Sequence, residues 1–346
     1  MASSSKPPQP PTPAGESLKK YWNRPVRDLV QVAAPALSQE SAERHRIMCH
    51  LAMALVARYW NSNKRGPIGD YPWRKDNRDP GSLYLGHNIA CIAVNHRGRV
   101  IDFDLNHNEI FNSSVEHAEA RLVRRVFALA AVHESEMLSL PKPDSEEGAW
   151  NKTWKAAGAV VEEWSDNIRF AASHYSTLLK DVTLYTSLES CAQCAGIMAL
   201  GAVKQVIFLQ RDPDQNSIGN ILFNLTAGTS YPAPQPIAAC DVDLDAFDEL
   251  SDKYDAFKRG VKKTPFFVSS DGKKRDTTAS ITSFLCTDEA LRIFESGKDA
   301  LMSTECHYAT WKPRSDALSN REVLEHARNF YRYASRLGRR GTPHRS

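Results

Sequence analysis

The sequence lacks any apolar run near the roughly 20 residues that a membrane-spanning helix requires. Residues 1–15 are rich in serine and proline and have no apolar centre, which argues against a secretory signal peptide. The net charge of +3 is too small to require a nucleic-acid partner. Seven cysteines, an odd number scattered over 346 residues, do not suggest a disulfide framework. We therefore expect a globular protein of the reducing cytoplasm without a membrane partner.

The chain is long enough for one large domain with extensions. Residues 1–40 are expected to be a disordered leader and linker, because their many Pro, Ser and Gln residues bury too little apolar surface. A globular domain is expected over residues 41–260, with a helical insertion at 134–179. Residues 261–346 then form a C-terminal extension that is mostly helical and ends in a basic tail.

Two apolar runs flank a turn in the first half of the domain. Residues 88–94 and 100–103 are separated by Gly98 and its neighbours, which predicts a β-hairpin. A helical pattern follows from about residue 115. Its first turn would carry His117 and Glu119.

A second group of elements lies after the insertion. Residues 182–186 are β-branched and aromatic and predict a strand, residues 191–201 predict a helix, and residues 203–209 predict another strand. This order predicts a parallel βαβ unit. Residues 212–236 are rich in Pro, Gly and Asn and are expected to be a loop, with a last strand at 237–242.

One histidine and two cysteines carry the chemistry. His117 precedes Cys191 and Cys194 by some seventy residues, and together they offer one nitrogen and two sulfur ligands. Zinc is usually four-coordinate, so three protein ligands leave one position for water. Glu119 lies two residues after His117, where it could move that water's protons. It is not expected to be a ligand, since its carboxylate would fill the open position.

The two cysteines fall at the N-terminal turn of a predicted helix, where the helix dipole and a metal both favour thiolate. Ser190 precedes them as the expected N-cap. Other interpretations of the C-x-x-C spacing are a redox pair or half of a structural zinc site. A structural Cys₂His₂ site would need a second histidine, for which the candidates are His107, His133 and His174.

The H-x-E and C-x-x-C pair resembles the signature of the zinc-dependent nucleobase deaminases. The chain is similar to the cytidine/deoxycytidylate-type superfamily, and most resembles its tRNA adenosine deaminase and guanine deaminase branch. Residues 183–196, TLYTSLESCAQCAG, resemble the branch pattern T-L-Y-x-[ST]-x-E-P-C-x-x-C-x-G. The resemblance covers roughly residues 85–135 and 180–240. Ser190 stands where the pattern has proline, and the segment between Glu119 and Cys191 is longer than usual.

The resemblance implies an α/β fold, a three-layer α/β/α sandwich around a mixed five-stranded sheet. It implies attack of zinc hydroxide on a base amidine carbon, with Glu119 as proton shuttle and ammonia as product. It also implies that Asn106, or its rival Asn108, contacts the substrate base or sugar. The backbone amide of Ala118 would contact the base. A homo-oligomer, such as a dimer, is expected.

Three functions follow as hypotheses. The first is hydrolytic deamination of a free base, nucleoside or nucleotide. The second is editing of tRNA or another nucleic acid by the same chemistry, because arginines such as Arg328, Arg332 and Arg336 make the C-terminus basic and could contact RNA phosphates. The other interpretation, a solvated helix face and a frayed tail, is the simpler one for those arginines. The third is a non-catalytic scaffold subunit of a deaminase complex, against which the presence of Glu119 argues.

Overall fold

The computed structural model describes residues 25–33, 35–60, 86–108, 111–136, 178–227, 229, 232–261, 267–268, 275–276 and 279–336. Three predicted features lie wholly or largely outside these residues. They are the N-terminal part of the leader, most of the insertion at 134–179, and the basic tail after residue 336.

A mixed five-stranded sheet forms the centre of the molecule, as the sequence predicted. Its strands follow the order β2-β1-β3-β4-β5. The hairpin strands are antiparallel to each other, and β1 is also antiparallel to β3. The strands β3, β4 and β5 run parallel, which confirms the predicted βαβ unit. The bounds are β1 (Ala90–Val94), β2 (Val100–Leu105), β3 (Thr183–Thr186), β4 (Gln205–Phe208) and β5 (Gln235–Ala238).

The hairpin turn is fixed by two residues that the sequence marks clearly. Gly98 has φ +89°, a conformation that side chains with a β-carbon rarely adopt. Asn95 accepts hydrogen bonds at its Oδ1 from the backbone amides of Arg97 and Arg99, both at 3.0 Å. This Asx-type arrangement reverses the chain between β1 and β2.

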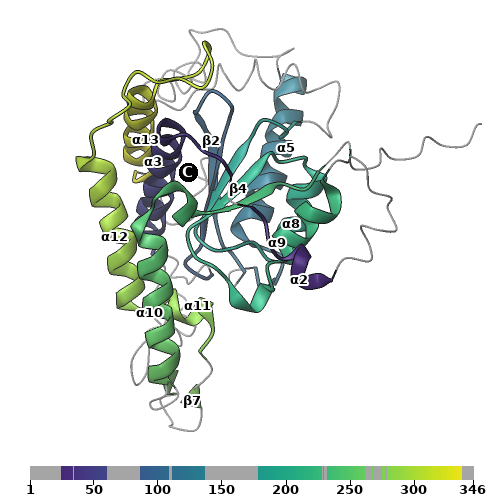
Figure 1. Ribbon diagram of the computed structural model, residues 1–346, viewed down its shortest axis with the longest axis vertical. Helices are drawn as coiled ribbons and strands as arrows, with labels where there is room; N and C mark the ends of the chain where they lie inside the picture. The colour runs from purple at the N-terminus through teal and green to yellow at the C-terminus, as the bar shows by residue number, and fades with distance from the viewer. Residues whose placement is uncertain are drawn as a thin grey trace, which may run out of the picture.

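Helices cover both faces of the sheet, which gives three layers (Figure 1). One face carries α5 (Ala118–Glu136) and α8 (Ala192–Leu200), with α9 (Ile218–Thr226) beside α8. The other face carries α3 (Gln39–Arg58) and α13 (Asn320–Ala334), with α12 (Asp288–Ser303) against α3. The helix α10 (Asp245–Val261) lies beside α12. Shorter elements are α2 (Val26–Leu29), η2 (Pro213–Gln215), η3 (Ala239–Val242), β6 (Phe267–Val268), β7 (Arg275–Asp276) and α11 (Ile281–Phe284).

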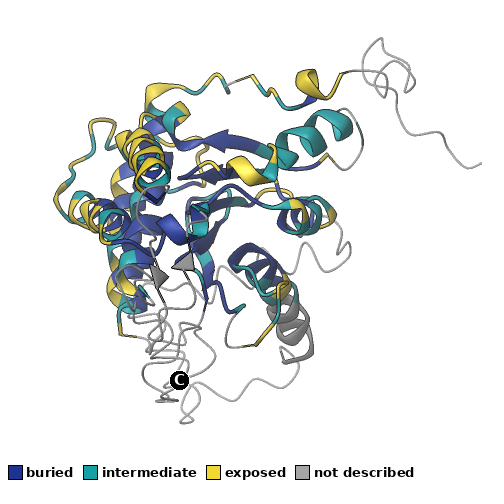
Figure 2. Cartoon of the chain, turned by 90° about the horizontal axis from the view of Figure 1, so that it is seen from below, coloured by how far each residue is buried: buried dark blue, intermediate teal, exposed yellow. Residues whose placement is uncertain are grey.

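The strand β2 is buried on both faces, and its side chains divide between the two helix layers. Phe103 lies between Tyr59, the C-cap of α3, and Phe330 of α13, with ring centroids 5.7 Å apart in both pairs. Asp102 and Asp104 point the other way and contact α5. Figure 2 shows the consequence, with burial concentrated in the strands and on the inward faces of the helices.

The C-terminal helices share one hydrophobic core with the sheet. The inner face of α3 is almost fully buried, as at Met48, Leu51 and Leu55. It is covered by α12, where Gly297 lets the helix approach Met53 closely. The residues expected to form a C-terminal extension therefore complete the layer on this face of the sheet.

Three element boundaries differ from the sequence-based expectation. The helix α5 begins at Ala118, so His117 lies just before the helix and not in its first turn. The loop expected over 212–236 contains the helix α9, because its apolar residues pack against α8 and β5. The last strand ends at Ala238 and a 3₁₀ turn follows. Gly and Asn suggested a loop at α9, and tertiary packing outweighs that local preference.

The asparagines of α9 have a separate structural use. Asn220 donates to the carbonyl of Val30 at 2.6 Å, and Asn224 donates to the carbonyls of Leu29 and Gln31 at 2.7 and 2.9 Å. These bonds fasten the α2 segment onto α9.

Among the helices described, none has both the length and the apolar character needed to cross a bilayer.

Candidate metal centre

Two helix starts bring the predicted ligands together. His117 precedes α5, while Cys191 is the N-cap of α8 and Cys194 lies in its first turn. The helices α5 and α8 pack against each other on one face of the sheet. His117 Nδ1 is 3.4 Å from Cys191 Sγ and 3.6 Å from Cys194 Sγ. The three ligand atoms all lie within 4.8 Å of one another.

These distances fit a tetrahedral metal site. With Zn–S near 2.3 Å and Zn–N near 2.0–2.1 Å, tetrahedral angles place neighbouring ligand atoms about 3.6–3.8 Å apart. The two distances from His117 Nδ1 to the sulfurs are close to that spacing. One imidazole and two thiols are also a donor set that zinc prefers over magnesium or calcium. The cluster could therefore hold a metal ion.

The protonation of the ligands is unequal. Hydrogen bonding from Cys194 lowers the pKa of Cys191 to about 4, which favours its thiolate form. The same interaction and burial raise the pKa of Cys194. The hydrogen bond to Cys191 raises the pKa of His117. A metal ion that binds here must therefore displace the proton held by Cys194, since thiolate is the ligand form.

Among the side chains that the structure describes, the metal-competent cluster consists of His117, Cys191 and Cys194 alone. The candidate fourth ligand His107 is engaged elsewhere, with its Nδ1 2.8 Å from the carbonyl of Leu105. The side chains of His133 and His174 lie outside the described residues. The structural Cys₂His₂ interpretation therefore gains no support from His107.

Glu119 lies beside the cluster and is almost completely buried, with 4% of its surface exposed. Its Oε1 accepts hydrogen bonds from Thr186 Oγ1 and Ser190 Oγ, both at 3.2 Å. Its Oε2 is 3.5 Å from Cys194 Sγ. Burial raises the pKa of Glu119, which favours the protonated form of its carboxyl group.

The prediction that Ser190 caps α8 is wrong. Cys191 is the N-cap, and it has no side-chain capping hydrogen bond. The Ser190 hydroxyl instead reaches Glu119, as described above. Sequence reasoning missed both hydroxyl partners of Glu119. The available signals were the serine in place of the pattern's proline, and Thr186 as the last residue of β3.

The two expected substrate-binding groups contact each other. The backbone amide of Ala118 donates to Asn106 Oδ1 at 2.7 Å, and both residues are buried. Asn106 therefore lies next to the metal-ligand loop and fixes the first residue of α5. The rival Asn108 instead accepts from the amide of His87 at 3.4 Å.

A network of charges holds the start of α5 against β2. Arg125 Nε and Nη1 lie 2.6 Å from Asp102 Oδ2 and Asp104 Oδ2, and its Nη2 donates to the Phe103 carbonyl. Arg121 Nε is 3.2 Å from Asp104 Oδ2. Both aspartates are at most 2% exposed. The network fixes α5 and so positions His117 and Glu119 at its start.

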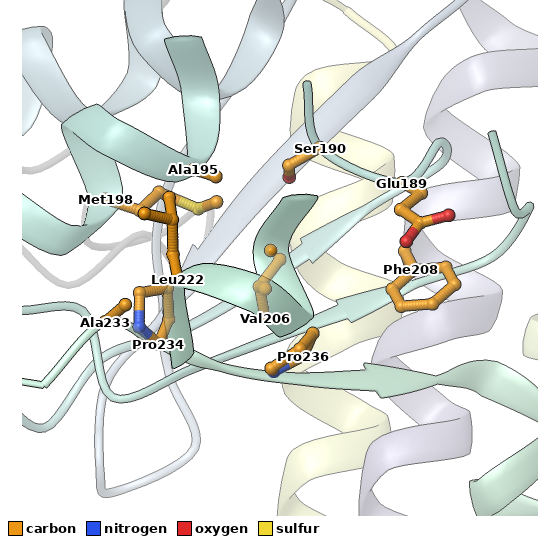
Figure 3. Close-up of a pocket in the computed structure, with 11 residues that line it drawn as sticks. Glu189, Ser190, Ala195, Met198, Val206, Phe208, Leu222, Ala233, Pro234 and Pro236 are labelled. Atoms are coloured by element: carbon orange, nitrogen blue, oxygen red, sulfur yellow. The ribbon is translucent and has the colours of Figure 1, made fainter. Parts of the chain in front are cut away.

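A small pocket lies beside the loop that enters α8 (Figure 3). Its walls are mostly apolar, and Glu189 and Ser190 supply the polar groups. Glu189 Oε2 accepts from the amide of Asp212 at 3.1 Å. Ser190 thus lies between this pocket and Glu119.

No family model matches the chain, and no curated protein matches it. A chain from a structural study of A-to-I editing by tRNA:A34 deaminases at the wobble position of transfer RNA is similar to it. The similarity covers 44% of this chain and 82% of that chain, with 18% sequence identity and a TM-score of 0.26. The sequence identity and the TM-score are both too low for this similarity to indicate a function.

Proposed function

We propose that the protein is a zinc-dependent hydrolase that deaminates a nucleobase-type amidine. One observation carries the proposal: the buried Glu119 carboxyl contacts Cys194 but is not one of the three ligands. Three ligands leave a position at which water can bind. A carboxyl beside that position is the arrangement that hydrolytic deamination needs.

His117, Cys191 and Cys194 would hold the zinc. When bound, zinc supplies an acidified water whose pKa falls to about 7. Glu119 takes a proton from water and delivers it to the ring nitrogen beside the reacting carbon. That carbon gains the water oxygen. Glu119 then passes the second water proton to the amine, the carbon–nitrogen bond breaks, and ammonia leaves while a carbonyl forms.

One of the basic side chains that suggested a nucleic-acid substrate has a structural partner. Arg328 donates to the carbonyls of Leu301 and Thr304 at 2.8 and 2.6 Å, and so completes the end of α12. It therefore has a structural use and is not directed at a phosphate. Asn106 and the Ala118 amide remain our proposed contacts to the base, for which the Ala118 amide would exchange its bond to Asn106 Oδ1. All seven cysteines are free, which supports a reducing cytoplasm.

Ammonia release from the zinc-loaded protein tests the proposal. The panel contains cytosine, adenine and guanine as bases, nucleosides and nucleotides, together with tRNA. Glu119→Gln should lower kcat by about 10²–10⁴-fold while bound zinc stays unchanged. Glu116→Gln is the matched control, because this carboxylate bonds Arg121 and Arg124 outside the ligand cluster.

Equal rates for Glu119→Gln and the wild-type protein would refute the proposed role of Glu119. Release from no member of the panel, combined with unfolding on zinc removal, would favour the scaffold interpretation. The homodimer remains a prediction, which light scattering on the same preparation would check.

A further inference from the structure

Two hydroxyl groups meet one oxygen of Glu119. Thr186 Oγ1 and Ser190 Oγ both donate to Oε1 at 3.2 Å, and the other oxygen, Oε2, faces Cys194 Sγ at 3.5 Å. Each carboxylate oxygen has about two lone-pair sites. Both sites of Oε1 are therefore occupied by hydroxyl donors. Oε2, the oxygen on the side of the metal ligands, is therefore not held by these hydroxyls.

The hydroxyls are themselves rigidly placed. Thr186 is the last residue of β3 and is fully buried, and Ser190 is 5% exposed. The loop between them is fastened by backbone hydrogen bonds from Ser187 to Ala90 at 3.0 Å and from Glu189 to Gln210 at 2.7 Å. The position of Oε1 is thus set by the sheet and not by α5 alone.

Serine at position 190 makes this arrangement specific to the chain. A proline there, as in the deaminase pattern that residues 183–196 resemble, has no side-chain donor. With proline at position 190, Oε1 of Glu119 would keep only one hydroxyl donor. The carboxylate group could then rotate more freely about its last side-chain torsion, which is broad in the absence of partners.

We propose that Ser190, together with Thr186, is a positioning residue that anchors Oε1 of Glu119 and so keeps Oε2 turned toward the metal ligands. This inference rests on the proposed deaminase function. Neither hydroxyl contacts the substrate in this proposal. Their effect is exerted through the orientation of the Glu119 carboxyl group.

Ser190→Ala is the first test. It should lower kcat about tenfold, because a hydrogen bond to a carboxylate that matters in the transition state is lost. KM and bound zinc should stay unchanged, since Ser190 contacts neither the substrate nor the ligands in this proposal. Ser190→Thr should recover most of the rate, and the Thr186→Val/Ser190→Ala pair should lose more than either change alone.

Ser187→Ala is the matched control. Its hydroxyl is equally buried but accepts from the Ala90 amide at 3.0 Å, in the same loop. It should reduce stability without changing kcat. If Ser187→Ala lowers kcat as much as Ser190→Ala, the effect is general loosening of the loop and the proposal is wrong.

A measurement without turnover separates this inference from the proposed function. The infrared carboxyl band of Glu119 is identified by its absence in Glu119→Gln, in the zinc-loaded protein. It should shift in Ser190→Ala and stay in place in Ser187→Ala. An unshifted band in Ser190→Ala overturns the anchoring. A shifted band with no ammonia release from any substrate keeps the anchoring and rejects the deaminase proposal.

Discussion

Replacement of Arg125 by methionine should destabilise the protein strongly. Arg125 is the main partner of Asp102 and Asp104, whose side chains are 2% and 1% exposed. Removing one partner of a buried ion pair costs roughly 3–5 kcal/mol, because the remaining charge stays buried without compensation. Arg121 Nε remains 3.2 Å from Asp104, so the lower end of this range applies, about 3 kcal/mol.

Urea unfolding followed by circular dichroism measures the effect. With a urea m-value near 3 kcal/mol/M, a loss of about 3 kcal/mol lowers the midpoint by about 1 M. Arg124→Met is the matched control on the same helix. Its side chain is 51% exposed and pairs with Glu116 at 2.9 Å, so its loss should cost at most about 1 kcal/mol.

The loss of stability in Arg125→Met should also change with pH in a definite direction. Burial already raises the pKa of Asp102, and the loss of Arg125 raises it further. A carboxyl with a raised folded-state pKa favours folding when it is protonated. The difference between Arg125→Met and the wild-type protein should therefore be largest at neutral pH and shrink as the pH falls. Equal urea midpoints for Arg125→Met and Arg124→Met at pH 7 would refute the reasoning.

Two further predictions concern packing and titration. Gly297→Ala should destabilise the protein by about 1–3 kcal/mol, because the new β-carbon would lie 2.5 Å from Met53 Cβ. Gly260→Ala should instead stabilise it by up to about 1 kcal/mol, because nothing lies within 4 Å of its new β-carbon. Thermal melts of the pair would check this, and equal shifts would contradict it. His326 Nε2 accepts from the Val100 amide at 2.9 Å, and burial lowers its pKa to about 4. Because the unfolded imidazole binds a proton below about pH 6.5, this residue should reduce stability by about 2 kcal/mol between pH 7 and pH 5. Urea midpoints at the two pH values should show a smaller decrease in His326→Gln, and an equal decrease would contradict the assignment.

The sequence predicted those parts of the fold that short-range patterns determine. The hairpin around Gly98 and the strand before Cys191 have clear periods and turn residues, and both are confirmed. The meeting of His117 with the two cysteines was predicted from a resemblance, and the packing of α5 on α8 brings them together.

Contacts between distant residues could not be predicted in the same way. Ser190 and Glu119 are 71 positions apart, and the local sequence at Ser190 suggested only a helix cap. Nothing in the local sequence around Arg125 indicates its burial against two aspartates of β2. The helix α9 was missed because its glycine and asparagines resemble a loop until their partners in the α2 segment are known.

The covering of α3 by the C-terminal helices bears on synthesis of the chain by the ribosome. Glu43 of α3 accepts from the backbone amides of His307 and Tyr308 and from Asn320, so its partners are translated long after α3. At 5–20 residues per second, translation leaves the apolar face of α3 without α12 and α13 for roughly tens of seconds. During that interval the nascent sheet has one bare apolar side, which makes the unfinished chain prone to aggregation.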